Sequence, residues 1–264
     1  MNPMFVKSKY LIFAVLFFLS MVLLASCSGD DERENGLVNI FLIDAPGDFD
    51  EVFVEVLGVE VVPDNGEPIF YDFIPANKMV NVANLVGEAS LLVGRGRIPI
   101  GMMTQMTLVL GEELYLQRAG QRINMEYASP ENRRIVFETN YNILGGVSYD
   151  LYIDIDLARS VRGIAGVFVF DPVARNFSNM GKGILTGTVN PPAARPYIYA
   201  FSDTDTLTTL TNAEGRYFFR GLNSGNYQIS IQPRPPYTDT TFISPIRTDT
   251  LNRIPTIVLR RPAA

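Results

Sequence analysis

Runs of alternating apolar and polar residues, separated by turn-forming residues, fill most of the chain after residue 36. In residues 37–44 apolar side chains occupy both faces of the alternation, which predicts a strand inside a sandwich. Residues 52–62 predict a second strand, in which Val56 and Val59 point to opposite faces. The Asn65-Gly66 pair that follows predicts a hairpin turn, because Asn-Gly tolerates the positive φ that such turns require.

The same alternation, broken by glycine and proline, predicts further strands along the rest of the chain. They are residues 69–73, 102–110, 114–117, 121–125, 135–138, 148–156, 167–170, 184–189, 197–201, 206–211, 217–219 and 227–231. Residues 80–93 fit either a short helix or a crossing loop, ended by Gly94-Arg95-Gly96. The pattern predicts an all-β protein with two tandem β-sandwich domains, at residues 37–177 and 178–264.

The first 26 residues have the parts of a secretory signal peptide. Lys7 and Lys9 give a charged start, and residues 11–24 form an apolar run. Leu24-Ala25-Ser26-Cys27 then resembles the bacterial lipoprotein signal, which implies cleavage before Cys27 and lipidation of that residue. The alternative is an uncleaved anchor with an incidental cysteine, although a transmembrane helix needs about 20 apolar residues.

The predicted lipid on Cys27 would hold the protein on the outer membrane. Each buried methylene contributes about 0.8 kcal/mol, so several acyl chains hold a protein firmly where one does not. Residues 27–36 would form the tether. Its acidic run Gly29-Asp30-Asp31-Glu32 resembles the surface-export signal of Bacteroidetes lipoproteins, and a solvated linker explains the run equally well. Periplasmic and outward-facing locations therefore both stay open.

Composition narrows the chemistry that the chain can perform. The chain has 22 basic and 28 acidic residues, and removal of residues 1–26, with two lysines and no acid, leaves a net charge of −8. This balance argues against a nucleic-acid partner, whose binding rests on cationic contacts to phosphate. There is no histidine and one cysteine, which excludes histidine-dependent catalysis and a disulfide within the chain. We predict no catalytic residue, no cofactor and no enzyme activity.

Carboxylates are the remaining candidates for chemistry. Asp154 and Asp156 share one face of a predicted strand with Asp150, because side chains alternate along a strand. Asp154 and Asp156 are candidate calcium ligands, or an acid pair for glycoside hydrolysis. The interpretation that we favour is a solvated strand face whose aspartates pair with arginines such as Arg159 or Arg162, because an isolated D-x-D is a weak motif.

Four segments of the first sandwich carry a family resemblance. They are Ile43-Asp44-Ala45-Pro46, residues 52–56, residues 100–106, and Asp154-Ile155-Asp156 with Ser160-Val161. Together they resemble domain-of-unknown-function family 4382 of bacteria and archaea, except that Met103 stands where that family usually has an aromatic residue. The resemblance covers most of residues 37–172 and implies an immunoglobulin-like or prealbumin-like sandwich with no attached activity. From the residues alone, Asp44 is predicted to cap backbone N–H groups of a turn.

Four segments of the second sandwich carry another resemblance. They are residues 185–189, 211–219, 221–222 and 225–227. They resemble the carboxypeptidase regulatory-like domain, a prealbumin-like sandwich, although the segment between Pro191 and Arg195 is compressed relative to many of its members. The resemblance implies a spacer or folding support.

The leading functional prediction is a non-enzymatic lipoprotein of the outer membrane or cell surface that serves adhesion or accessory binding. Its partners would be the membrane, through the lipid on Cys27, and an extracellular polymer or surface protein of unknown identity, bound by loops. The alternative is a structural component of a surface assembly, joined by strand addition at open sheet edges. A remote alternative is a carboxylate-dependent hydrolase that uses Asp154 and Asp156.

Overall fold

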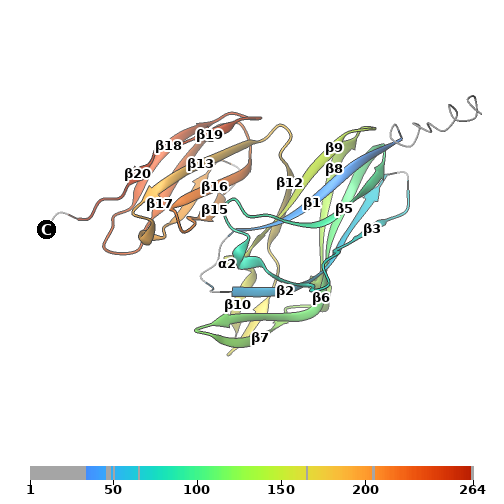
Figure 1. The fold of residues 1–264 in the computed structure, drawn as a ribbon, viewed down its shortest axis with the longest axis horizontal. Helices are drawn as coiled ribbons and strands as arrows, with labels where there is room; N and C mark the ends of the chain where they lie inside the picture. The colour runs from blue at the N-terminus through green and yellow to red at the C-terminus, as the bar shows by residue number, and fades with distance from the viewer. Residues whose placement is uncertain are drawn as a thin grey trace, which may run out of the picture.

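A computed structural model describes residues 34–45, 49, 51–64, 66–164, 166–203 and 206–262. Within these residues the chain forms two β-sandwiches that lie side by side (Figure 1). The predicted signal peptide, Cys27 and its acidic run lie outside the described residues. No helix within the described ranges is long and apolar enough to cross a membrane.

The N-terminal sandwich has one sheet of four strands and one of eight. The first sheet has the order β12 (Ala174–Ser178), β9 (Ser148–Asp156), β1 (Asn35–Ala45), β5 (Leu91–Pro99). The second has the order β10 (Val161–Ile164), β11 (Val167–Phe170), β7 (Gln121–Tyr127), β6 (Gly101–Arg118), β2 (Glu51–Pro63), β3 (Ile69–Asp72). β4 (Met79–Asn81) also pairs with β2, and β8 (Arg134–Ile143) also pairs with β6. The short helices are η1 (Val82–Asn84), η2 (Pro130–Arg133) and α2 (Leu157–Ser160).

The C-terminal sandwich packs two sheets around a second hydrophobic core. One sheet has the order β16 (Arg216–Leu222), β13 (Gly183–Asn190), β19 (Leu251–Arg253), and β20 (Ile257–Val258) also pairs with β13. The other has the order β15 (Thr206–Leu210), β14 (Tyr197–Phe201), β17 (Gly225–Gln232), β18 (Thr240–Ile246). A short helix, η3 (Pro192–Ala194), follows β13. The predicted fold class, all-β with tandem sandwiches, is confirmed.

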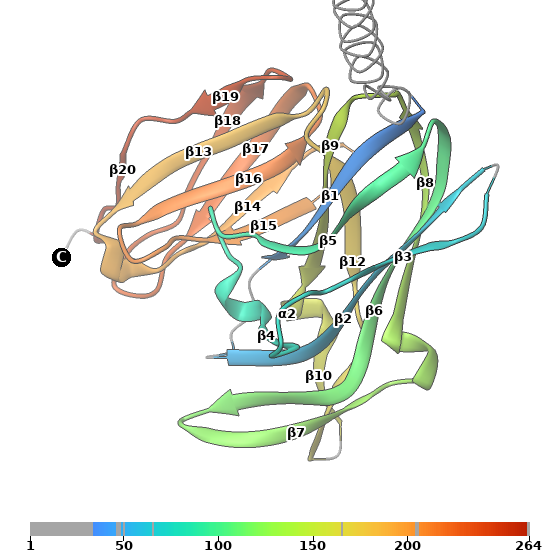
Figure 2. The same cartoon turned by 45° about the vertical axis from the view of Figure 1, so that its right-hand side comes forward.

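β1 lies inside its sheet because neighbours cover both of its edges and its apolar face. Val38, Ile40 and Leu42 are fully buried in the N-terminal core. β1 pairs antiparallel with β5 and parallel with β9, and the second pairing places Ile43 level with Asp154. The ends of β1 and β9 therefore carry their polar residues to the same place, on the side of the C-terminal sandwich (Figure 2).

β2 buries residues that simple alternation assigns to opposite faces. Val56 and Val59 are both fully buried in the same core. The pairing of β2 with β6 shifts its register between Val56 and Gly58, and the extra residue of this β-bulge turns the following side chains over. Alternation therefore predicted the strand correctly. The predicted opposite orientation of Val56 and Val59 is wrong, because both side chains lie in the same core.

β5 corrects the prediction for residues 80–96. A crossing segment with η1 is present, but β5 then runs through Gly94-Arg95-Gly96, which was predicted to end the segment. Tyr71 of β3 packs on these glycines, since a Cβ on Gly96 would lie 2.0 Å from Cε1 of Tyr71. Glycine therefore serves close packing at this point of the strand.

Besides β4 and β5, whose residues were largely assigned to a helix or loop, β10 and β12 of the N-terminal sandwich were not predicted. β12 is short and polar, and its polar side chains have partners: the Asn176 amide oxygen accepts a hydrogen bond of 2.9 Å from the Tyr141 hydroxyl. β12 continues to Ser178, and β13 begins at Gly183. The segment between them carries the chain from one sandwich to the other.

Candidate functional site

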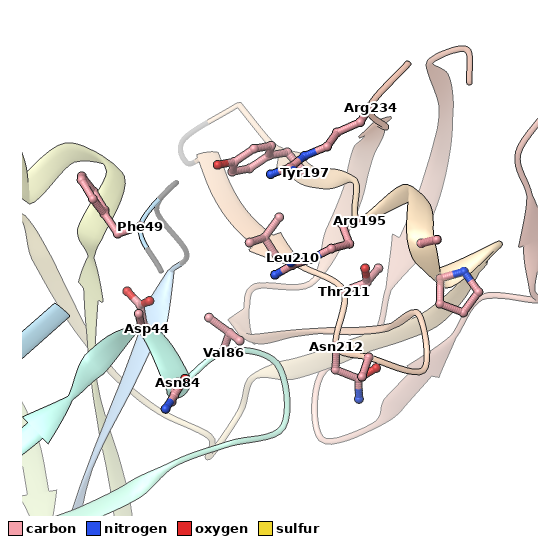
Figure 3. A pocket seen from close by; sticks show the side chains of 14 residues that line it. Asp44, Phe49, Asn84, Val86, Arg195, Tyr197, Leu210, Thr211, Asn212 and Arg234 are labelled. Carbon is pink, nitrogen blue, oxygen red and sulfur yellow. The ribbon is translucent and has the colours of Figure 1, made fainter. Parts of the chain in front are cut away.

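A cleft of about 870 Å³ lies between the two sandwiches. Figure 3 shows its two walls, with Asp44, Phe49, Asn84 and Val86 on one side and residues of the C-terminal sandwich on the other. The C-terminal wall consists of Pro192, Ala193, Arg195, Tyr197, Leu210, Thr211, Asn212, Ala213 and Arg234. Residues of both sandwiches line this cleft, so both are needed to form it.

Asp44 stands at the end of β1 and is the carboxylate of the cleft. Its side chain is 6% exposed, and neither carboxylate oxygen has a hydrogen-bond partner among the described residues. Its backbone N–H donates to the carbonyl of Leu85 over 3.0 Å, which fixes the position of the residue. The turn that Asp44 is predicted to cap lies largely outside the described residues, so this role stays a prediction.

Burial raises the pKa of the Asp44 carboxyl well above its ordinary value. The negative charge of Asp154, one strand away, adds to this increase, and Asp156 adds a smaller part. The nearby backbone N–H of Leu157 acts in the opposite direction and lowers the pKa. A buried acid with a raised pKa holds its proton and can donate as well as accept a hydrogen bond.

Thr211 occupies a comparable position on the C-terminal wall. It is 6% exposed, and its hydroxyl oxygen has no hydrogen-bond partner in the described residues. Next to it, the side-chain oxygen of Asn212 accepts hydrogen bonds from the backbone N–H groups of Glu214 and Arg216, which shape the turn. An unpaired buried polar group costs about 1–3 kcal/mol. The cleft therefore has such a group on each wall.

Arg195 supplies an exposed guanidinium to the same wall. It follows η3 with φ 36° and ψ 58°, a left-handed conformation that is uncommon outside glycine. A residue held in this region costs roughly 1–3 kcal/mol and persists only when its surroundings require it. In Figure 3 the Arg195 side chain extends from its ribbon toward the cleft.

Arg220 of β16 connects the two sandwiches. Its guanidinium donates to the carbonyls of Gly87 and Glu88 in the N-terminal sandwich, over 2.9 Å in each case. It also lies 5.9 Å from the ring centroid of Tyr152 on β9. Burial lowers the pKa of Arg220, while the charges around it oppose that decrease. A second arginine, Arg216, forms a more exposed ion pair with Glu88 over 3.3 Å.

Arg175 extends this joint on the N-terminal side. Its Nε and Nη2 atoms both contact Oδ2 of Asp154, at 2.9 and 2.8 Å, and Nη2 also donates to the carbonyl of Arg220 over 3.3 Å. The Arg175 guanidinium lies 4.7 Å from the ring centroid of Phe177. The same arginine thus neutralises a buried aspartate and contacts the other sandwich, so the joint has a defined geometry.

The predicted group of aspartates is divided among three environments. Asp150 is exposed and accepts a hydrogen bond of 2.7 Å from Asn39. Asp154 is buried against Arg175, and Asp156 caps α2 by accepting a hydrogen bond from the backbone N–H of Arg159 over 3.0 Å. The predicted solvated face is therefore wrong for Asp154, because the C-terminal sandwich covers the end of β9.

The predicted pairing with Arg162 is also corrected, because Arg162 pairs with Asp171 instead. Burial raises the pKa of Asp156, and the Arg159 N–H opposes this shift. Within the described ranges, no three side chains of histidine, cysteine, aspartate or glutamate are placed to hold a metal ion. The weak calcium assignment to Asp154 and Asp156 stays a prediction.

Sequence reasoning did not find the cleft. The sequence marks Asp44 as a turn residue and as part of a family motif, and it does not single out Thr211 or Arg195 for binding. The available signal was an aspartate at the end of an otherwise apolar strand, which is unusual because a buried carboxylate needs a partner. Nothing along the chain places Asp44 near Thr211, 167 positions away, since that depends on how the sandwiches dock.

A family model described as "Domain of unknown function (DUF4382)" matches residues 35–172, slightly more than half of the chain. Among curated proteins, none matches the sequence significantly.

Solved structures give distant matches. The Bacillus anthracis TIE protein is 12% identical with a TM-score of 0.27; the match covers 86% of this chain and 34% of that one, so this chain spans about a third of its length. A minor pilin of Streptococcus agalactiae is 8% identical with a TM-score of 0.27, covering 86% and 97% of the two chains. The major pilin subunit BcpA of Bacillus cereus is 11% identical with a TM-score of 0.24, covering 86% and 71%. At these TM-scores the likeness carries no argument about function.

Proposed function

We propose that this chain, which belongs to the DUF4382 family, is a non-enzymatic, lipid-anchored surface protein that binds an extracellular polymer or partner protein between its sandwiches. The observation that carries the proposal is the cleft at the joint, walled by both sandwiches and containing an unpaired buried polar group on each side. Concave sites at domain interfaces, with a few convergent polar groups, are typical ligand sites.

The joint supports binding because it holds the two walls in one arrangement. Arg220 bonds to two carbonyls across the joint, and Arg175 contacts both Asp154 and the Arg220 carbonyl. Preorganised walls reduce the conformational entropy that binding would otherwise cost. The anchor at Cys27, inferred from the signal sequence, would place this site at the envelope.

The chemistry of the cleft supports binding without conversion. Hydrolysis by a carboxylate pair needs two carboxyl groups on either side of the scissile bond. Of the described side chains that line the cleft, Asp44 is the one carboxylate, so a second carboxylate is lacking among them. Asp154 is paired with Arg175, and Asp156 caps α2, so both residues of the predicted acid pair have structural partners.

Two experiments test the anchor and the binding separately. Metabolic labelling with an alkyne fatty acid, followed by protease treatment of intact cells, should label the wild-type chain and remove it from the surface. The Cys27→Ala variant should carry no label. A glycan and matrix-protein binding screen with the full chain, secreted without lipid as Cys27→Ser, should then identify a ligand that is recovered unchanged. An unlabelled wild-type chain, or a ligand recovered cleaved, would contradict the proposal.

A second candidate function, a structural subunit of a surface assembly, is favoured by one edge strand. β18 ends its sheet, pairs with β17 along one side, and leaves Ile243 70% exposed. No described strand pairs with its outer edge. However, Pro245 lies within β18 and has no N–H to donate, a feature that protects edge strands from pairing. Electron microscopy of the concentrated full chain would show ordered polymers if this function held.

A further inference from the structure

We propose that the ligand of the cleft is a short acidic oligosaccharide, with its carboxylate at Arg195 and its ring hydroxyls toward Asp44 and Thr211. This inference rests on the proposed binding function and names its ligand class. It uses three features of the cleft: unpaired groups suited to hydroxyls, cationic side chains at the rim, and aromatic rings on both walls.

The unpaired groups are the first feature. Asp44 and Thr211 are both 6% exposed, come from different sandwiches, and have side-chain oxygens without a hydrogen-bond partner among the described residues. A threonine hydroxyl can donate and accept, and so can a protonated carboxyl. A sugar hydroxyl also donates and accepts, so the hydroxyls of a ligand in the cleft match the chemistry of both residues. Buried polar groups of native proteins are nearly always paired, which makes two unpaired ones at one cleft informative.

Positively charged side chains at the rim of the cleft are the second feature. Arg195 and Arg234, both exposed, line the C-terminal wall. The described lining of this wall includes two guanidinium groups and no acidic side chain. Guanidinium groups match a carboxylate by bidentate hydrogen bonding. The left-handed backbone of Arg195, with φ 36°, holds its side chain at this place.

Aromatic rings on both walls of the cleft are the third feature. Phe49 and Tyr197 stand on opposite walls (Figure 3). Tyr197 begins a row on the outer face of β14, stacking on Tyr199 at 6.5 Å between ring centroids, and Tyr199 stacks on Phe201 at 5.8 Å. These three side chains are partly exposed. Aromatic rings present a flat apolar face with a polar tip, which suits the mixed surface of a sugar. A cleft of about 870 Å³ is within the size range of sites for small ligands.

Calorimetric titration of the full Cys27→Ser chain tests the assignment. The probes are a galacturonic-acid trisaccharide, its carboxyl-reduced neutral form, and a glutamate peptide of equal charge. We expect saturable binding of the acidic trisaccharide, about tenfold weaker binding of the neutral form, and no saturable binding of the peptide. Equal binding of the acidic and neutral forms, binding of the peptide alone, or no binding of any probe would overturn the assignment.

Two variants separate the parts of the site. Arg195→Gln should weaken the acidic trisaccharide about tenfold and leave the neutral form unchanged, with Arg134→Gln on β8 as a matched control outside the cleft. Thr211→Val, which keeps the side-chain shape, should weaken both sugars about tenfold while the ligand-free chain melts no lower than wild type. Its control is Thr209→Val on β15, a buried threonine that does not line this cleft.

The outcomes separate this inference from the proposed function. If the binding screen finds another ligand whose affinity is unaffected by Arg195→Gln and Thr211→Val, the surface-binding function stands and the ligand assignment falls. If the protein is not lipidated or not exposed on cells while the trisaccharide still binds, the site assignment stands and the proposed location falls.

Discussion

At the residue scale, Asp44 is a buried acid that costs the fold stability. It is buried, its oxygens lack partners among the described residues, and Asp154 and Asp156 lie near enough to raise its pKa further. Natural proteins retain such groups where function needs them, at a cost in stability. Ordinary turn chemistry explained Asp44 in the sequence, because the sequence does not show that a second sandwich covers the end of β1.

Asp44→Asn should reduce the loss of folding stability that accompanies a rise in pH. The folded chain holds the Asp44 proton more tightly than the unfolded chain, so wild-type stability falls as pH rises from the ordinary pKa of 3.8 through the raised folded pKa. Asparagine cannot ionise, so the variant should melt higher than wild type at pH 7, and the difference should shrink near pH 4. Thermal melts from pH 4 to 8 measure this difference. The control is Asp150→Asn, which changes an exposed aspartate of β9. A variant that melts lower than wild type at pH 7 would contradict the account.

The Asp154–Arg175 ion pair should contribute more to the free energy of unfolding than an exposed ion pair of the same type. Arg175→Met would leave Asp154, 7% exposed, without its cation, and breaking a buried pair costs about 3 kcal/mol. The matched variant Arg162→Met breaks a pair in which both side chains are about half exposed, and it should cost less than about 1 kcal/mol. Urea unfolding of both variants measures the difference. Equal costs would show that the second sandwich does not shield Asp154.

At the element scale, alternation predicted most strands well, and β9 and β11 begin and end where it placed them. It failed where a strand depends on a partner that is distant in sequence. The bulge near Gly58 reverses the faces of β2, and polar β12 is a strand because Tyr141 and Asp154 bind its side chains. The glycines of β5 look like a break because the ring of Tyr71, which replaces their missing side chains, comes from another strand.

Gly96→Ala tests this packing. The added Cβ would lie 2.0 Å from the Tyr71 ring, so the ring, whose hydroxyl donates to the carbonyl of Arg97 over 2.7 Å, must shift. Such overpacking costs about 1–3 kcal/mol. Gly163→Ala in β10 is the matched control, since the nearest atom to its new Cβ is 3.8 Å away in the Phe168 ring. A urea midpoint for Gly96→Ala equal to that of the control would mean that Tyr71 is not packed on β5.

At the scale of the whole molecule, the joint decides whether two sandwiches act as one binding unit. Tandem sandwiches could be predicted from strand patterns. Their docking could not, because no pattern in the sequence indicates that Arg220 lies near Glu88 and Asp154. The cleft is a product of that docking. The functional residues were therefore less predictable than the fold.

Arg220→Met should loosen the joint. It removes two hydrogen bonds from a charged donor to the carbonyls of Gly87 and Glu88, worth roughly 3 kcal/mol together. Small-angle scattering should show a larger radius of gyration and a broader distance distribution. Arg216→Met removes only the exposed pair with Glu88 and should leave the scattering curve unchanged. An unchanged curve for Arg220→Met would show that other contacts fix the joint.

Hydrogen–deuterium exchange of the full chain, with and without the ligand that the binding screen selects, measures most directly whether this joint is the binding site. The account predicts slower exchange on both walls together, at residues 83–87 and at residues 192–197 and 210–213, with the ligand recovered intact. Protection confined to one sandwich away from the cleft, or a ligand recovered in pieces, would contradict it.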